Sequence, residues 1–125
     1  MLVSPRIMAV VGALAVGAVA VACGGASLDT IEPAVGVAEV RVLDNRFEPR
    51  VIEVEAGVEV TWDFAGRRDH NVVGGGWGSD VMREGTFSHT FEAAGTHNYL
   101  CTLHGGMSAR VLVVEAPLSH GPPRR

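Results

Sequence analysis

The feature that most constrains the fold is a strict alternation of apolar and polar side chains over short runs. In residues 58–64 the apolar members are Val58, Val60, Trp62 and Phe64, and every residue between them is polar. Residues 52–55 and 86–91 repeat this two-residue period, and Ala56-Gly57 separates two of the runs. Alternation of this kind is typical of half-buried β-strands, and no segment after residue 22 shows a sustained helical period. Short strands divided by turns predict an all-β sandwich.

The N-terminal residues are typical of an export signal. Residues 1–6 are weakly basic, residues 7–22 are apolar or small, and the run ends in Ala20-Val21-Ala22. This A-x-A ending predicts a signal peptide over residues 1–22 that is removed on export. An uncleaved membrane anchor is the alternative, although the apolar run is shorter than the roughly twenty residues that a spanning helix needs.

Cys23 follows this ending and gives it a second interpretation. Ala20-Val21-Ala22-Cys23 is similar to a bacterial lipobox, except that the usual leucine is replaced by Ala20. We expect Cys23 to carry lipid, because a free exposed thiol is a liability in an oxidising compartment. The protein would then lie at the outer face of the cytoplasmic membrane or in the periplasm, anchored through this lipid. Simple cleavage, which leaves Cys23 as a free thiol, is the alternative.

The remaining chain divides into three parts. Residues 23–36 are small and acidic and predict a flexible tether. Residues 37–115 hold the alternating runs and are sufficient for one modest core. Residues 116–125 contain three prolines and end in two arginines, which predicts a disordered tail. Without residues 1–22 the chain has nine Arg, no Lys and fourteen acidic residues, a formal charge of 9 − 14 = −5, which argues against nucleic acid as a partner.

The candidate functional residues are concentrated near the end of the domain. Cys101, His104 and Met107 lie within seven residues, and His70 precedes them by about thirty. Two imidazoles, one thiolate and a weak thioether are the ligand set of a blue-copper centre. Structural zinc would require more thiolates, and the C-x-x-C-H attachment sequence of c-type haem is absent. Each residue alone has an ordinary explanation in packing or in a polar loop, but their combination predicts a site for one copper ion that cycles between Cu(I) and Cu(II).

The other histidines and Trp77 receive structural interpretations. His89 and His97 lie in predicted strands and His120 in the tail, and none has a partner at ligand spacing. Trp77 follows three consecutive glycines in the long segment 65–85. We expect a surface crossover in which Trp77 folds back over the core. The alternative is that Trp77 shapes the surface near the metal.

Five segments of the chain carry a family resemblance. These are Asp44-Asn-Arg-Phe-Glu-Pro49, residues 55–62, His70-Asn-Val72, residues 85–91 and Tyr99-Leu-Cys-Thr-Leu-His-Gly-Gly-Met107. Over residues 37–114 they resemble, in the same order, the small cupredoxins of the plastocyanin, pseudoazurin and amicyanin group. The two residues between His104 and Met107 are similar to the short amicyanin loop, and Leu103 stands where many relatives have proline.

The resemblance implies a Greek-key sandwich with copper near one end, bound by His70, Cys101, His104 and Met107. It also implies that Asn71 connects the two ligand-bearing segments; a simple turn residue is the alternative. The function expected is that of a monomeric electron carrier and not an enzyme. It would shuttle single electrons between redox partner proteins that dock transiently near His104. A copper-binding or delivery protein without electron transfer is the alternative, and a redox enzyme would need an open coordination position.

Overall fold

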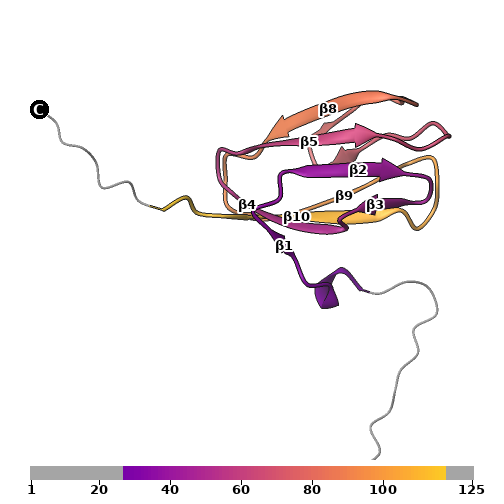
Figure 1. The fold of residues 1–125 in the computed structure, drawn as a ribbon. Coiled ribbons are helices and arrows are strands. Elements are labelled where there is room, and N and C mark those ends of the chain that lie inside the picture. Colours follow the sequence, from indigo (N-terminus) through magenta and orange to yellow (C-terminus); the bar gives the residue numbers. More distant parts are fainter. Residues whose placement is uncertain (1–26, 118–125) are drawn as a thin grey trace, which may run out of the picture.

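Strands in which apolar and polar residues alternate form two sheets that pack face to face (Figure 1). The computed structural model describes residues 27–117. One sheet has the order β1-β4-β10-β9-β6-β7, with bounds Ala34–Val35, Val51–Glu55, Ser108–Val114, Gly95–Leu100, Val73–Gly74 and Trp77–Gly78. The other has the order β3-β2-β5-β8, with bounds Arg46–Glu48, Glu39–Leu43, Glu59–Phe64 and Gly85–Thr90. A short 3-10 helix, η1, spans Leu28–Thr30.

The chain passes between the sheets several times, and neighbouring strands are often distant in sequence. β10 lies between β4, to which it is parallel, and β9, to which it is antiparallel. β5 is parallel to β2 and antiparallel to β8. The expected all-β Greek-key sandwich is therefore confirmed. β10, which contains Val111, Val113 and Val114, is an interior strand of its sheet.

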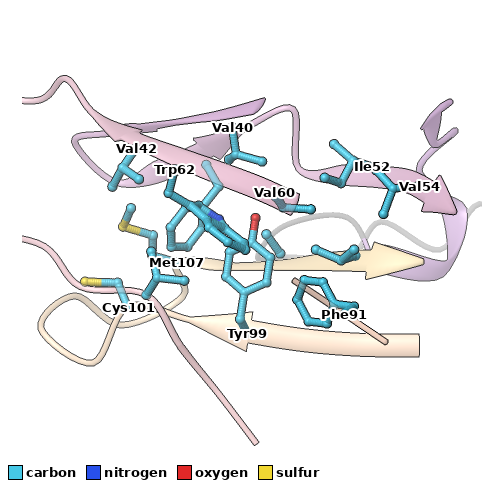
Figure 2. Packing of buried hydrophobic residues seen from close by; sticks show 14 of the residues in the cluster. Val40, Val42, Ile52, Val54, Val60, Trp62, Phe91, Tyr99, Cys101 and Met107 are labelled. Carbon is cyan, nitrogen blue, oxygen red and sulfur yellow. The ribbon is translucent and has the colours of Figure 1, made fainter. Parts of the chain in front are cut away.

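The core lies between the sheets and consists of the apolar members of each alternation (Figure 2). Along β5 the side chains of Val60, Trp62 and Phe64 are buried, whereas Glu59 and Asp63 are exposed. Along β10 the buried positions are Ala109, Val111 and Val113. The two-residue period thus fixes which face of each strand turns inward, because a shift by one residue would expose the whole apolar set.

The two ends of the sandwich differ in chemistry. At one end lies the loop 101–107 between β9 and β10, which we call the ligand loop. The other end is reached by the first residues of β2 and β5 and the last residues of β4, β8 and β10. Five exposed glutamates mark this glutamate end: Glu39, Glu55, Glu59, Glu92 and Glu115.

Two parts of the chain differ from expectation. Within the predicted tether 23–36, residues from Ser27 onward lie against the domain. η1 is followed by β1, which pairs with β4, and Asp29 forms an ion pair with Arg110 at 2.7 Å. The composition of this segment, which is small and acidic, did not indicate that β1 pairs with β4 or that Asp29 binds Arg110. The predicted signal peptide 1–22, Cys23 and residues 118–125 of the predicted tail lie outside the described residues.

The second difference concerns the glycine run. Instead of a plain crossover, β6 and β7 form a small hairpin in which Gly74 pairs with Trp77. A side chain at Gly74 would collide with the Trp77 ring, so glycine is needed for this close approach. Trp77 is half-buried and packs on Trp62, Phe91 and Tyr99, as the interpretation of a lid on the core requires. Within residues 27–117 no helix has the length and apolar character needed to cross a membrane.

Candidate metal centre

The ligand loop holds three of the four predicted ligands between two strands of one sheet. Cys101 directly follows β9 and Met107 directly precedes β10, and the Cys101 N–H donates to the Met107 carbonyl at 3.0 Å. This hydrogen bond closes the base of the loop where the β9–β10 ladder ends at the Leu100–Ser108 pair. The loop is therefore anchored at both ends by rigid backbone.

His70 reaches the same end of the sandwich from the other sheet. It follows β5 after five intervening residues and forms an isolated antiparallel β-bridge with Met82. The backbone groups of these two residues exchange hydrogen bonds of 2.9 and 2.8 Å. The bridge fixes the backbone of His70 although the residue lies outside the long strands.

The side chains of His70, Cys101 and His104 converge. Nδ1 of His70 lies 3.7 Å from Cys101 Sγ, and Nδ1 of His104 lies 3.8 Å from the same sulfur. The two imidazole rings are 4.6 Å apart between centroids. One potential ligand atom from each of the three residues lies within 4.8 Å of the others. Two ring nitrogens thus face one sulfur across a gap the size of a single ion.

The separations fit a metal with one sulfur and two nitrogen ligands. With metal–sulfur and metal–nitrogen bonds of about 2.3 and 2.0 Å, ligands at trigonal angles lie about 3.7 Å apart. The two observed sulfur–nitrogen separations, 3.7 and 3.8 Å, match this value. Among the described residues, the histidine, cysteine and acidic side chains that could hold an ion together are His70, Cys101 and His104.

Burial differs among the four predicted ligands. His70, Cys101 and Met107 are 1%, 3% and 2% exposed, whereas His104 is half-buried. The sulfur atoms of Cys101 and Met107 lie at the same end of the core (Figure 2). Of the two histidines at the site, His104 is the one that reaches toward the surface.

Asn71 connects the two segments that carry these residues. Its side-chain amide donates to the Thr102 hydroxyl at 2.9 Å, and its carbonyl oxygen accepts the Thr102 backbone N–H at 2.8 Å. Asn71 is 8% exposed. The partner Thr102 was not identified from the sequence, since no local pattern pairs residues 31 positions apart.

Asp44 is a further residue that the sequence analysis did not single out as functional. Its carboxylate oxygen Oδ1 lies 3.0 Å from His70 Nε2 and also accepts the backbone N–H groups of Arg67 and Arg68. The hydrogen bond from His70 lowers the pKa of Asp44, and the two backbone N–H groups act in the same direction against partial burial. Since β2 and β5 pair in parallel with Val42 opposite Phe64, Asp44 comes level with Gly66, just before His70. Only this long-range pairing reveals the contact.

The remaining predicted bystanders lie away from the three converging side chains. His89 is half-buried on the edge strand β8 and stacks on Trp77 at 4.9 Å. His97 is half-buried on β9, and its Nε2 lies 3.3 Å from the Ala93 carbonyl. Neither contributes to the converging group. His120 lies outside the described residues.

Comparisons with known proteins agree with this geometry. The chain matches no protein-family model. It is 32% identical over 117 residues to amicyanin-alpha of Methylorubrum extorquens, a match that spans 86% of this chain and 98% of the relative. A solved oxidised amicyanin variant has a TM-score of 0.54 and 32% identity over 62% of this chain and 82% of that one.

A purple cupredoxin from Nitrosopumilus maritimus shares the fold, with a TM-score of 0.56 at 22% identity over 61% of this chain and 98% of that one. The match to amicyanin-alpha covers most of this chain and nearly the whole relative. A donor set of two imidazoles, a thiolate and a thioether suits copper, and the separations at Cys101 leave room for one ion. The chain therefore belongs to the small cupredoxins, as a relative of amicyanin whose cofactor is one copper ion.

Proposed function

We propose that the protein carries single electrons between redox partner proteins. Its copper would be bound by Nδ1 of His70, Sγ of Cys101 and Nδ1 of His104, with Met107 as a weaker fourth ligand. The observation that carries this proposal is the approach of both Nδ1 atoms to one cysteine sulfur, at 3.7 and 3.8 Å. The ion supplies the Cu(I)/Cu(II) couple, and the protein supplies a ligand set that suits both oxidation states.

Rigid support of these ligands favours rapid electron transfer, because little has to move when the charge changes. The Cys101–Met107 backbone hydrogen bond closes the ligand loop, and the Met82 bridge holds His70. The paired hydrogen bonds between Asn71 and Thr102 hold the two segments together. Ligands supported in this way by neighbouring contacts keep their geometry more precisely than ligands on a free loop.

We infer that partners dock over the ligand loop near His104. A shallow hollow there is lined by Leu100, Thr102, His104 and residues 105–108. Leu100 and Leu103 are 45% and 46% exposed, and a side chain added at Gly105 would meet no atom within 4 Å. Another protein can therefore approach the half-buried His104 closely. A small contact of this kind suits a redox encounter, in which the partner must leave again quickly.

The same reasoning favours a carrier over an enzyme or a copper-delivery protein. Four protein ligands leave no open coordination position for a substrate, and the three most buried of them, at 1–3% exposure, do not favour rapid exchange of the ion. We propose that the protein acts as a monomer. We also propose export to the periplasm or the outer face of the cytoplasmic membrane, with lipid on Cys23; mass spectrometry of protein isolated from membranes tests this modification.

The decisive experiment adds Cu(II) to the purified protein and records its visible spectrum through cycles of reduction and reoxidation. We expect an intense blue or violet absorption from the bond between Cys101 and copper. It should bleach and return with one electron per protein, and Cys101→Ser should abolish it. Rapid loss of copper to a chelator would favour delivery, and reduction of nitrite or oxygen without a partner would favour an enzyme.

A further inference from the structure

We propose that Asp44 is a positioning residue of the metal centre, which holds His70 with Nδ1 toward Cys101 and favours the oxidised state of the site. The inference rests on the proposed function, since it assigns His70 as a ligand. Neither the ligand spacing nor the family resemblance singled out this carboxylate. Its role follows from the four hydrogen bonds that it accepts, one from His70 and three from the backbone N–H groups of Arg67 and Arg68.

The first contact is with His70 itself. His70 is 1% exposed, and its Nε2 lies 3.0 Å from Asp44 Oδ1. An ionised carboxylate has no proton to give, so Nε2 carries the proton and donates it. The other ring nitrogen, Nδ1, is then left with its lone pair, and this is the atom that faces Cys101 Sγ at 3.7 Å. The hydrogen bond therefore selects the tautomer that can bind a metal at Nδ1.

The carboxylate is itself held in place by the backbone. Its Oδ1 accepts the N–H groups of Arg67 and Arg68, each at 3.0 Å, and Oδ2 lies 3.1 Å from the same Arg67 nitrogen. A Cβ atom built at Gly66 would lie only 2.5 Å from Oδ1 and 3.0 Å from the Asp44 backbone nitrogen. Glycine at position 66 is what allows the loop before His70 to wrap around the carboxylate.

The charge of Asp44 acts differently on the two oxidation states. The oxidised site has one more positive charge than the reduced site, and a fixed negative charge stabilises the more positive state. The His70 Nε2–H and the backbone N–H groups of Arg67 and Arg68 all donate to this carboxylate, and donors of this kind favour its ionised form. The Asp44 side chain is 32% exposed, so solvent screens part of the effect. A hydrogen bond to the carboxylate also makes the imidazole a more basic ligand. Both effects lower the reduction potential.

Four variants separate these effects. Asp44→Asn removes the charge but keeps an oxygen that can accept the His70 N–H. Asp44→Ala removes both the charge and the acceptor, and Gly66→Ala displaces the carboxylate without removing it. Asp69→Asn is the matched control. It removes one acidic charge next to His70, where the carboxylate is 53% exposed and pairs with Arg83 at 3.2 Å instead.

The first measurement is the reduction potential, from a redox titration of the visible band in which a mediator supplies one electron to convert Cu(II) to Cu(I). Removing a residue that supports a ligand typically changes metal affinity by roughly tenfold or more. If Asp44→Asn weakens Cu(II) binding relative to Cu(I) binding roughly tenfold, the potential rises by about 59 mV. Gly66→Ala should shift in the same direction, and Asp69→Asn much less. Equal shifts in Asp44→Asn and Asp69→Asn would overturn the assignment.

The second measurement needs no copper. Nitrogen NMR of the copper-free protein should show His70 protonated at Nε2 in the wild type and in Asp44→Asn, and a mixture of tautomers in Asp44→Ala. A wild-type His70 protonated at Nδ1 would contradict the positioning role. The proposed function fails separately, if the wild-type protein gives no intense visible band with Cu(II).

Discussion

Asn71 and Thr102 exchange two hydrogen bonds, of 2.9 and 2.8 Å, although 31 residues separate them in the chain. Asn71 follows His70, and Thr102 follows Cys101. The pair therefore joins the loop that contributes one imidazole to the loop that contributes the thiolate, one residue away from each. It limits how far the two segments can separate when the charge at the site changes.

Replacing Asn71 with alanine should weaken this connection. We expect Asn71→Ala to lower the free energy of unfolding of the copper-free protein by about 1 kcal/mol, because the Thr102 backbone N–H loses its acceptor. Copper affinity should fall by roughly 10- to 100-fold. Urea unfolding and competition with a chelator measure the two effects. As a control, Asn98→Ala removes an exposed acceptor of Arg110 and should leave copper affinity unchanged.

A charge on the ligand loop should hinder the proposed docking of partners near His104 without disturbing the copper. We expect Gly105→Glu to slow electron self-exchange between two molecules by roughly tenfold, because like charges then meet at the contact. NMR line broadening in mixtures of oxidised and reduced protein measures this rate. Ala94→Glu adds the same charge beyond β8, near the glutamate end, and should change the rate little. Equal effects of both variants would place the docking surface elsewhere.

Arg67 and Arg68 offer a test of how charge guides small redox reagents. Both are exposed, and within residues 27–117 neither guanidinium has a side-chain partner. They lie in the loop that leads to His70, so we expect Arg67→Glu with Arg68→Glu to slow oxidation by anionic hexacyanoferrate at least severalfold at low salt. Stopped-flow rates should converge with the wild type at high ionic strength. Arg41→Glu, on the exposed face of β2, is the control for net charge and is compared with Arg67→Glu alone, which changes the charge by the same amount.

The hairpin of β6 and β7 predicts that alanine at Gly74 and alanine at Gly75 have different effects on stability. A Cβ at Gly74 would collide with the Trp77 ring, whereas one at Gly75 meets nothing within 4 Å. We expect Gly74→Ala to destabilise the protein by about 1–3 kcal/mol through overpacking. Gly75→Ala should be neutral or slightly stabilising, since it restricts only the unfolded chain. Urea unfolding compares the two, and a similar loss in both would refute the close packing of Trp77 on β6.

Because Tyr99 is buried, we expect the protein to lose stability in alkaline solution. It is 2% exposed, and burial raises its pKa far above the usual value of 10.0. Below pH 10 the phenol is neutral in both the folded and unfolded states, so it has no effect. Above about pH 10 the unfolded chain gains stability by ionising, and unfolding becomes easier by up to about 1.4 kcal/mol per pH unit.

The composition makes this effect easy to isolate. Tyr99 is the chain's one tyrosine and there is no lysine, so few other groups titrate in the same range. The urea midpoint of the copper-free wild type should decline above pH 10 more steeply than that of Tyr99→Phe. The ultraviolet phenolate band should appear only on unfolding. Parallel pH profiles for the two proteins would show that ionisation of Tyr99 is not responsible.

The strands could be predicted from the sequence because their signal is local. Alternation in residues 58–64 and 86–91 marks β5 and β8 and assigns Trp62 to the core without knowledge of their partners. The candidate ligands Cys101, His104 and Met107 could be recognised for the same reason, since they share one short loop.

Features that depend on pairing over long distances could not be predicted in this way. Asp44 meets His70 because β2 and β5 are parallel and in one particular register, and nothing in residues 44–49 indicates this. Residues 34–35 pair with β4 although the surrounding composition is that of a linker. The fit between Gly74 and Trp77 likewise exists only once the hairpin is formed. Composition and local periodicity carry no information about such contacts.

The glutamate end has a consequence for how the molecule rotates in solution. Five exposed acidic side chains gather there, and within residues 27–117 no arginine lies among them, whereas Arg67 and Arg68 lie near the opposite end. This separation gives the protein an electric dipole along its long direction. Close to any negatively charged surface, a torque turns the copper toward that surface before contact is made. Fewer collisions then start from the wrong face, so the charge at one end improves the yield of encounters at the other.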